Sequence, residues 1–200
     1  IKNLYITTDA VEGIAAWNRY FIGKFGTGAT VKNLAFTNAR CGDGTGAKSG
    51  DTFFTQSTDK GEGDMYNIEN IYMELSVGAG WGRYAFGADQ QNGFKAKNVI
   101  VKMLNTTATS GCSALASNMV VNEGYLNGVY FVCATSDAKL AANYKWAGGA
   151  NATAPDSKFA AFYASDEAMK EASNDYSAFA ASGYWTIVDG LPVFGVPAEA

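Results

Sequence analysis

Carboxylate side chains that could bind a metal ion or transfer protons gather in one Gly-rich segment. Asp59, Glu62 and Asp64 lie within Asp59-Lys60-Gly61-Glu62-Gly63-Asp64. Oxygen ligands of this kind suit calcium, but their spacing matches neither the EF-hand loop nor the Gly-rich nonapeptide. A solvated loop is therefore the favoured interpretation. Asp59, Glu62 and Asp64 are retained as calcium candidates, and no cofactor is expected.

Carboxylates could also hydrolyse a glycosidic bond. That chemistry needs two carboxyl groups about 5–10 Å apart, one to protonate the leaving group and one to act as base or nucleophile. Asp9, Glu12 and Asp51 could contribute to such a pair. The sequence does not select the pair, and it has no basic cluster that would stabilise the charge of a uronate. A chain without a catalytic centre is preferred, and a polysaccharide-degrading enzyme is the alternative.

The scarcity of histidine and cysteine excludes other classes of site. The 200 residues contain no His, so Ser-His-Asp and Cys-His nucleophiles and histidine zinc sites are excluded. Cys41, Cys112 and Cys133 lack the spacing of metal ligands. They are interpreted as small buried hydrophobic residues, with a Cys112–Cys133 bridge left open.

The strongest pattern is a six-residue motif that occurs five times. Its form is an apolar residue, a usually charged residue, Asn or Gly, and then apolar–any–apolar. The third positions of the five copies are Asn3, Asn33, Asn70, Asn98 and Gly128. Steps of 30, 37, 28 and 30 residues separate them, and a period of this length is typical of a solenoid. Five ordinary antiparallel strands are the alternative.

The third position of the motif predicts a bend in every copy. Asn and Gly are the residues that most readily adopt left-handed backbone angles. After the bend, apolar residues alternate with a period of two, which predicts a short strand with one face in the core. We expect the five third positions to stack at one corner. We also expect one internal column, formed by Leu34, Ile71, Val99 and Val129.

The residue between each inward pair should point outward, and three tyrosines occupy this position. The outer column is Tyr5, Ala35, Tyr72, Ile100 and Tyr130. Stacked about 5 Å apart, tyrosines could contact sugars or another chain, or loops or the C-terminal segment could cover them. The candidate binding or interface residues are therefore Tyr5, Tyr72 and Tyr130, with Trp17 and Trp81 from the segments between motifs.

Composition agrees with many short strands in one domain or one domain with an appendage. Charged residues make up 17%, hydrophobic residues 48%, and Gly occurs 23 times. The formal net charge is −4 and the basic residues are scattered singly, which argues against a nucleic-acid partner. The apolar stretches are too short to span a membrane, so insertion into a bilayer is not expected.

Three parts follow from these patterns. Residues 1–134 are predicted to form the repeats, 135–157 an irregular connection, and 158–200 a small cap on the C-terminal end. Within the cap, Ser165 is the expected N-cap of a helix that carries Met169 and Ala172 on one face. Apolar runs on both sides of Asp189-Gly190 predict a β-hairpin, with Pro192 on an edge strand.

The first strand is expected to need a partner. Ile1 already lies inside a motif copy, so the strand at the beginning of the sequence would present unpaired backbone groups. Solenoid ends are ordinarily closed by a polar cap. We therefore expect a preceding segment or another subunit to cover residues 1–6.

Two segments resemble repeat modules of known surface proteins. Phe25-Gly26-Thr27-Gly28-Ala29-Thr30-Val31-Lys32-Asn33-Leu34 is similar to a repeat of Gram-positive and gut-bacterial surface proteins, including GLUG-type modules. The ending from Trp185 to Phe194 resembles their closing segment. Such modules also occur in phages that infect these bacteria. The resemblance weakens at Ala96, at Gly128 and in the 37-residue step. It implies display outside the cell or on a virion, and it carries over no catalytic residue.

The sequence therefore predicts an all-β fold: a parallel β-helix (solenoid) of about five coils with a small C-terminal α/β cap. The expected function is a non-enzymatic display or adhesion module of a phage virion or bacterial surface protein. The expected partners are other subunits of the assembly and host glycans. Besides the polysaccharide-degrading enzyme, a purely structural fibre spacer is an alternative.

Overall fold

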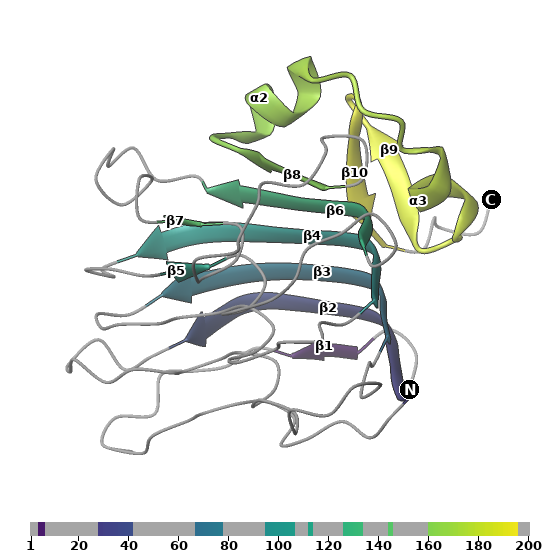
Figure 1. The fold of residues 1–200 in the computed structure, drawn as a ribbon, viewed down its shortest axis with the longest axis horizontal. Helices are drawn as coiled ribbons and strands as arrows, with labels where there is room; N and C mark the ends of the chain where they lie inside the picture. Colours follow the sequence, from purple (N-terminus) through teal and green to yellow (C-terminus); the bar gives the residue numbers. More distant parts are fainter. Residues whose placement is uncertain are drawn as a thin grey trace.

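A parallel sheet of six strands organises the molecule (Figure 1). The computed structural model describes residues 4–6, 28–41, 67–77, 95–106, 112–113, 126–133, 144–145 and 160–195. The six strands lie in chain order, and every adjacent pair is parallel. They are β1 (Leu4–Ile6), β2 (Thr30–Cys41), β3 (Asn67–Val77), β4 (Lys95–Thr106), β6 (Leu126–Cys133) and β8 (Ala160–Tyr163).

Two further short strands form a second parallel pair. They are β5 (Cys112–Ser113) and β7 (Tyr144–Lys145), with Cys112 opposite Tyr144. From β4 to β8 the chain therefore alternates between the large sheet and the small one. Of the predicted irregular connection over 135–157, the structure describes β7 alone, and a strand of two residues is too short to show any periodicity in the sequence.

The register of the large sheet confirms the alignment of the motif copies. Leu4 pairs with Leu34, Leu34 with Ile71, Ile71 with Val99, and Val99 with Val129. The internal column is buried, since Ile71 and Val99 are 0% exposed and Val129 is 1% exposed. Parallel pairing in this register contradicts the antiparallel alternative.

No pattern in the sequence predicted the sixth strand. β8 pairs with β6 in parallel, with Ala160 opposite Val129 and Phe162 opposite Phe131. Its residues, Ala160-Ala161-Phe162-Tyr163, carry neither Asn nor Gly at a bend position. The segment 158–200 is therefore only partly a cap, because its first strand continues the sheet.

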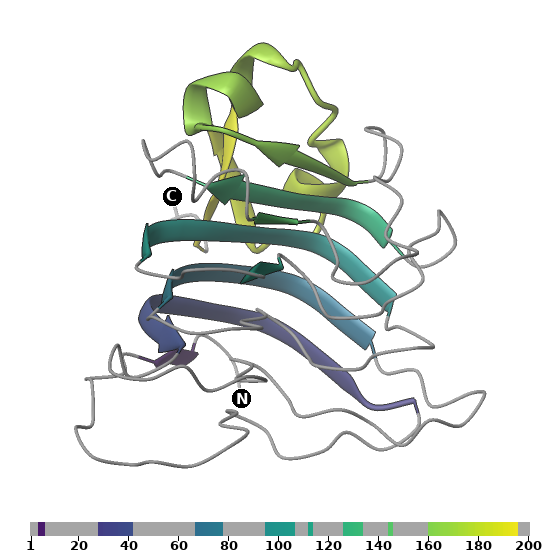
Figure 2. The same cartoon turned by 60° about the vertical axis from the view of Figure 1, so that its left-hand side comes forward.

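The rest of this segment, residues 164–195, forms two short helices and a hairpin, and we call it the C-terminal segment. Its elements are α2 (Asp166–Glu171), α3 (Ser177–Ala181), β9 (Trp185–Val188) and β10 (Leu191–Phe194). Both views place it at the β8 end of the sheet (Figures 1 and 2). None of the described helices is long and apolar enough to cross a membrane.

Local signals predicted the C-terminal segment well. The Ser165 hydroxyl caps α2 by accepting a hydrogen bond of 3.1 Å from the backbone N–H of Ala168. Asp189 and Gly190 have φ of 49° and 82°, so both hairpin-loop residues are left-handed. Val188 pairs with Leu191 across this two-residue loop, the geometry that an Asp-Gly pair favours.

Replacement of Ile71 by Ala tests the importance of the internal column. Ile71 is 0% exposed, so Ile71→Ala removes packed methyl groups and leaves a cavity. We expect the free energy of unfolding to fall by about 2–5 kcal/mol in urea titrations. Ile187→Ala is the matched control, because Ile187 is 39% exposed on β9. Equal losses in the two variants would contradict the assignment of Ile71 to the core.

Candidate functional site

The third position of each motif forms the expected corner. Asn33, Asn70 and Asn98 have φ of 62°, 52° and 53°, and Gly128 has φ of 64°. Each left-handed residue bends its strand and resets the alternation, so apolar side chains point inward on both sides of the bend. In β4, for example, Ala96 and Val99 are buried and Lys97 is exposed. The prediction of a shared left-handed bend is confirmed at these four positions.

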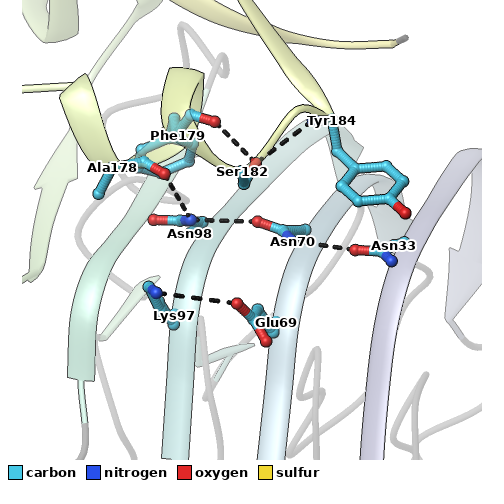
Figure 3. Close-up of polar contacts among 9 residues, drawn as sticks. All are labelled: Asn33, Glu69, Asn70, Lys97, Asn98, Ala178, Phe179, Ser182 and Tyr184. Carbon is cyan, nitrogen blue, oxygen red and sulfur yellow. Dashed lines mark hydrogen bonds and ion pairs between the residues drawn. The ribbon is translucent and has the colours of Figure 1, made fainter.

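The three described asparagines bond to one another in a ladder (Figure 3). Asn70 Nδ2 donates to Asn33 Oδ1 at 3.0 Å, and Asn98 Nδ2 donates to Asn70 Oδ1 at 3.1 Å. All three side chains are buried. An amide both donates and accepts, so identical residues one strand apart satisfy each other. The ladder thereby fixes the register between β2, β3 and β4.

The C-terminal segment closes this ladder. Asn98 Nδ2 also donates to the carbonyl of Ala178 in α3 at 3.0 Å. In the next strand Gly128 occupies the corner, and a Cβ atom there would lie 2.9 Å from Cε2 of Phe179. Asn98 Oδ1 has no hydrogen-bond partner among the described residues, since glycine supplies no amide to continue the ladder. The departure from Asn at this copy therefore makes room for Phe179.

The outer column is covered rather than exposed. Tyr130 is 2% exposed and Ile100 is 1% exposed, and both belong to one buried cluster with Met169, Phe179 and Trp185. Of the alternatives left open for this column, coverage by the C-terminal segment is therefore the one observed at Ile100 and Tyr130. The direction of the Tyr130 side chain was right, but alternation in a strand cannot reveal what covers the outward face.

Aromatic rings fasten the C-terminal segment to the sheet. Tyr130 stacks on Phe179 with ring centroids 5.9 Å apart, and Tyr176 meets Tyr130 edge-on at 5.6 Å. Trp185 contacts Phe179 at 5.0 Å and reaches Tyr72 on β3 at 6.2 Å, in both cases edge to face. The segment therefore extends from the end of the sheet across its outer face, and half-buried Tyr72 lies at the margin of the contact.

Polar contacts border this aromatic cluster. Tyr72 Oη donates to Glu74 Oε1 at 2.6 Å, and Lys102 Nζ lies 2.8 Å from Asp166 Oδ2. Burial, followed by the hydrogen bond and charge of Glu74, raises the pKa of the Tyr72 phenol well above its ordinary value. Burial raises the pKa of Tyr130 in the same direction. The Lys102–Asp166 ion pair joins β4 to α2, and the Tyr72–Glu74 hydrogen bond orients the Tyr72 ring beside the cluster.

A second, exposed row of side chains lies on the other side of the corner. Lys32, Glu69, Lys97 and Asn127 occupy the second motif position and pair in register across β2, β3, β4 and β6. Lys97 Nζ lies 3.8 Å from Glu69 Oε1, and their side chains are 53% and 35% exposed (Figure 3). None of these four residues was a site candidate from the sequence, although the usually charged second position of the motif is the signal that could have identified them.

Most other sequence candidates fall outside the described residues. For Tyr5, Cys112 and Cys133 the structure describes backbone pairing alone, with Ala35, Tyr144 and Met103 respectively. No three His, Cys, Asp or Glu side chains come together as metal ligands in the described ranges. The candidates outside these ranges are Trp17, Trp81, Asp59, Glu62, Asp64, Asp9, Glu12 and Asp51.

Comparison with known proteins does not assign a function. No protein-family model matches the chain, and no curated protein or solved structure gives a significant match. Its function therefore has to be inferred from its own residues and their arrangement.

Two substitutions of Asn70 separate the side-chain and backbone roles of the ladder. Asn70→Gly keeps the left-handed backbone but removes the bonds to Asn33 and Asn98, which should cost about 1–3 kcal/mol of unfolding free energy. Asn70→Ala should cost about 1–2 kcal/mol more, because a Cβ disfavours left-handed angles in a residue without a polar side chain. Exposed Asn127→Ala is the control and should change stability by less than about 0.5 kcal/mol. Three equal denaturation midpoints would contradict the role of the ladder.

Alkaline pH should destabilise the protein through its covered tyrosines. Burial in the folded protein raises the pKa of Tyr130, whereas a tyrosine in the unfolded chain ionises near its ordinary pKa of about 10. Above that pH the folded state binds more protons than the unfolded state, so this contribution to stability is complete below about pH 10 and lost as pH rises further. Urea titrations between about pH 8 and 11 should show a smaller loss for Tyr130→Phe than for the unmodified chain. Complete tyrosinate absorbance in a chain that is still folded would contradict this account.

Proposed function

We propose that the chain is a parallel β-helix acting as a non-enzymatic display and adhesion module of a virion or bacterial surface, in contact with glycans. The alternation between two parallel sheets supports the β-helical part of the proposal. Successive coils of such a helix contribute one strand to each sheet, and β4, β5, β6, β7 and β8 follow this order. The repeated corner at Asn33, Asn70, Asn98 and Gly128 is consistent with stacked coils of equal shape.

The observation that carries the functional part is the closure of the asparagine ladder by the C-terminal segment. Buried amides and apolar columns hold successive strands in one arrangement, and ring contacts of Tyr72 and Tyr130 fix the C-terminal segment against them. The carboxylates on or against the sheet engage neighbouring side chains: Glu69 with Lys97, Glu74 with Tyr72, and Asp166 with Lys102. A fold of this kind holds exposed side chains at fixed spacings, which suits recognition of a repetitive partner.

The resemblance of the first full repeat and the closing segment to surface modules supports the location. It favours an extracellular or virion-surface setting in which other subunits are the neighbours. The exposed row of Lys32, Glu69, Lys97 and Asn127 would then contact polymers of the cell envelope. Within this proposal the aromatic outer column has a structural role, because the C-terminal segment covers Ile100 and Tyr130.

A binding assay with product analysis tests the proposal. The full chain is mixed with envelope polysaccharides from Gram-positive and gut bacteria and with intact cells, and both bound protein and polymer length are measured. We expect saturable binding and unchanged polymer length. Cells stripped of surface polysaccharide are the control and should bind less. Shortening of the polymer that is abolished by one Asp or Glu substitution would establish the polysaccharide-degrading enzyme instead. Absence of binding to both cells and polymers would favour the purely structural fibre spacer.

A further inference from the structure

We propose that an acidic polysaccharide binds the polar face formed by Lys32, Asn67, Glu69, Lys95, Lys97 and Asn127, an inference that rests on the proposed function and names its ligand class. These residues precede the corner in β2, β3, β4 and β6. Ile68 lies between Asn67 and Glu69, and Ala96 lies between Lys95 and Lys97. Both are buried, as is Leu126 before Asn127, so these side chains point away from the core.

Strand pairing assembles a basic surface that is not evident in the sequence. Lys32 pairs with Glu69, and Glu69 pairs with Lys97, although these residues come from three separate repeats. Lys95 lies two residues before Lys97 on the same face, and all three lysines are exposed. Among the described residues, a chain with a formal net charge of −4 therefore places three lysines on a face with a single carboxylate.

The spacing of these charges suits a polymer with separated acidic groups. Lys32 and Lys97 lie on strands two apart, which corresponds to about 10 Å between backbones. Glu69 lies between them and would repel a polymer with closely spaced negative charges. DNA carries one charge per about 1.7 Å of its axis. An acidic polysaccharide places fewer charges along its length and presents hydroxyl groups between them.

Neutral hydrogen-bonding groups complete the polar face. Asn127 is exposed beside Lys97, and Asn67 Nδ2 donates to Thr30 Oγ1 at 3.4 Å while its carbonyl oxygen can still accept. Glu69 accepts from sugar hydroxyls, and its contact with Lys97 at 3.8 Å is long enough for a ligand to compete. Donors and acceptors therefore alternate across neighbouring strands, as hydroxyl-rich ligands require.

The C-terminal segment borders this face but leaves it open. Figure 3 shows Ala178 on one side of the asparagine ladder and Lys97 and Glu69 on the other. The side chains of Lys97 and Glu69 are 53% and 35% exposed. Tyr184 is half-buried and packs against the aromatic cluster, so it belongs to the C-terminal segment and not to the polar face.

Charge-neutralising variants of the full chain test the inference. Affinity is measured by calorimetry at low salt for polygalacturonate, a lightly substituted dextran sulfate whose sulfate groups are well separated along the chain, uncharged dextran and double-stranded DNA. Lys32→Gln and Lys97→Gln should each weaken binding to the acidic polysaccharides roughly two- to fivefold, as expected for exposed ion pairs, and reduce its salt dependence. Glu69→Gln should strengthen binding, because it removes the carboxylate between the two lysines. Lys170→Gln on exposed α2 is the matched control and should have no effect.

The outcomes separate this inference from the proposed function. Preference for polygalacturonate identifies a carboxylated ligand and preference for dextran sulfate a sulfated one, and either supports the inference. Unchanged affinity in both lysine variants, or a loss of affinity in Glu69→Gln, would overturn it. Equal affinity for DNA or for dextran would also overturn it. Binding to cells without binding to either acidic polysaccharide would overturn this inference alone, whereas absence of binding to cells and polymers would overturn the proposed function as well.

Discussion

The left-handed residue at the corner is the constraint on which the rest of the structure depends. A strand that bends through ordinary extended residues would turn its next side chain to the wrong face, because side chains alternate with a period of two. One left-handed residue bends the strand and also adds one position to the alternation, so that apolar side chains face the core on both sides of the bend. Asn accepts this backbone at low cost and offers an amide that bonds to its counterpart in the next strand. The same residue therefore shapes each strand and aligns it with its neighbour, as the bonds joining Asn33, Asn70 and Asn98 demonstrate.

The end of the ladder determines where the C-terminal segment lies. Each amide has two N–H groups and uses only one of them within the ladder, and buried polar groups without partners are costly. The carbonyl of Ala178 accepts from Asn98, and the absence of a side chain at Gly128 admits the ring of Phe179. Once Phe179 is in place, Tyr130, Tyr176 and Trp185 pack around it. The sheet is thus buried on both faces beyond the corner, as is usual for parallel sheets.

Repeating and local patterns in the sequence predicted the strands and turns well. The motif located five strands and their register, Ser165 located a helix, and Asp189-Gly190 located the hairpin. β8 was missed because Ala160-Ala161-Phe162-Tyr163 has no left-handed residue at a bend, and β7 because two residues show no period. The sequence left open what covers Tyr130. A sequence pattern gives the direction of a side chain, whereas its covering depends on residues such as Met169 and Phe179, which lie far along the chain.

The polar face is a second feature whose surroundings a sequence pattern does not reveal. Lys32, Glu69 and Lys97 are far apart in the sequence, and the parallel register of the motif copies brings them side by side. A parallel register places equivalent motif positions side by side, so a weak preference for charge at the second position becomes a continuous row. The two sides of the corner differ because the C-terminal segment covers one and not the other. In the proposed function, rigidity and recognition would therefore arise from the same repeat: the third motif position fixes the strands, and the second presents charges at the spacing that those strands impose.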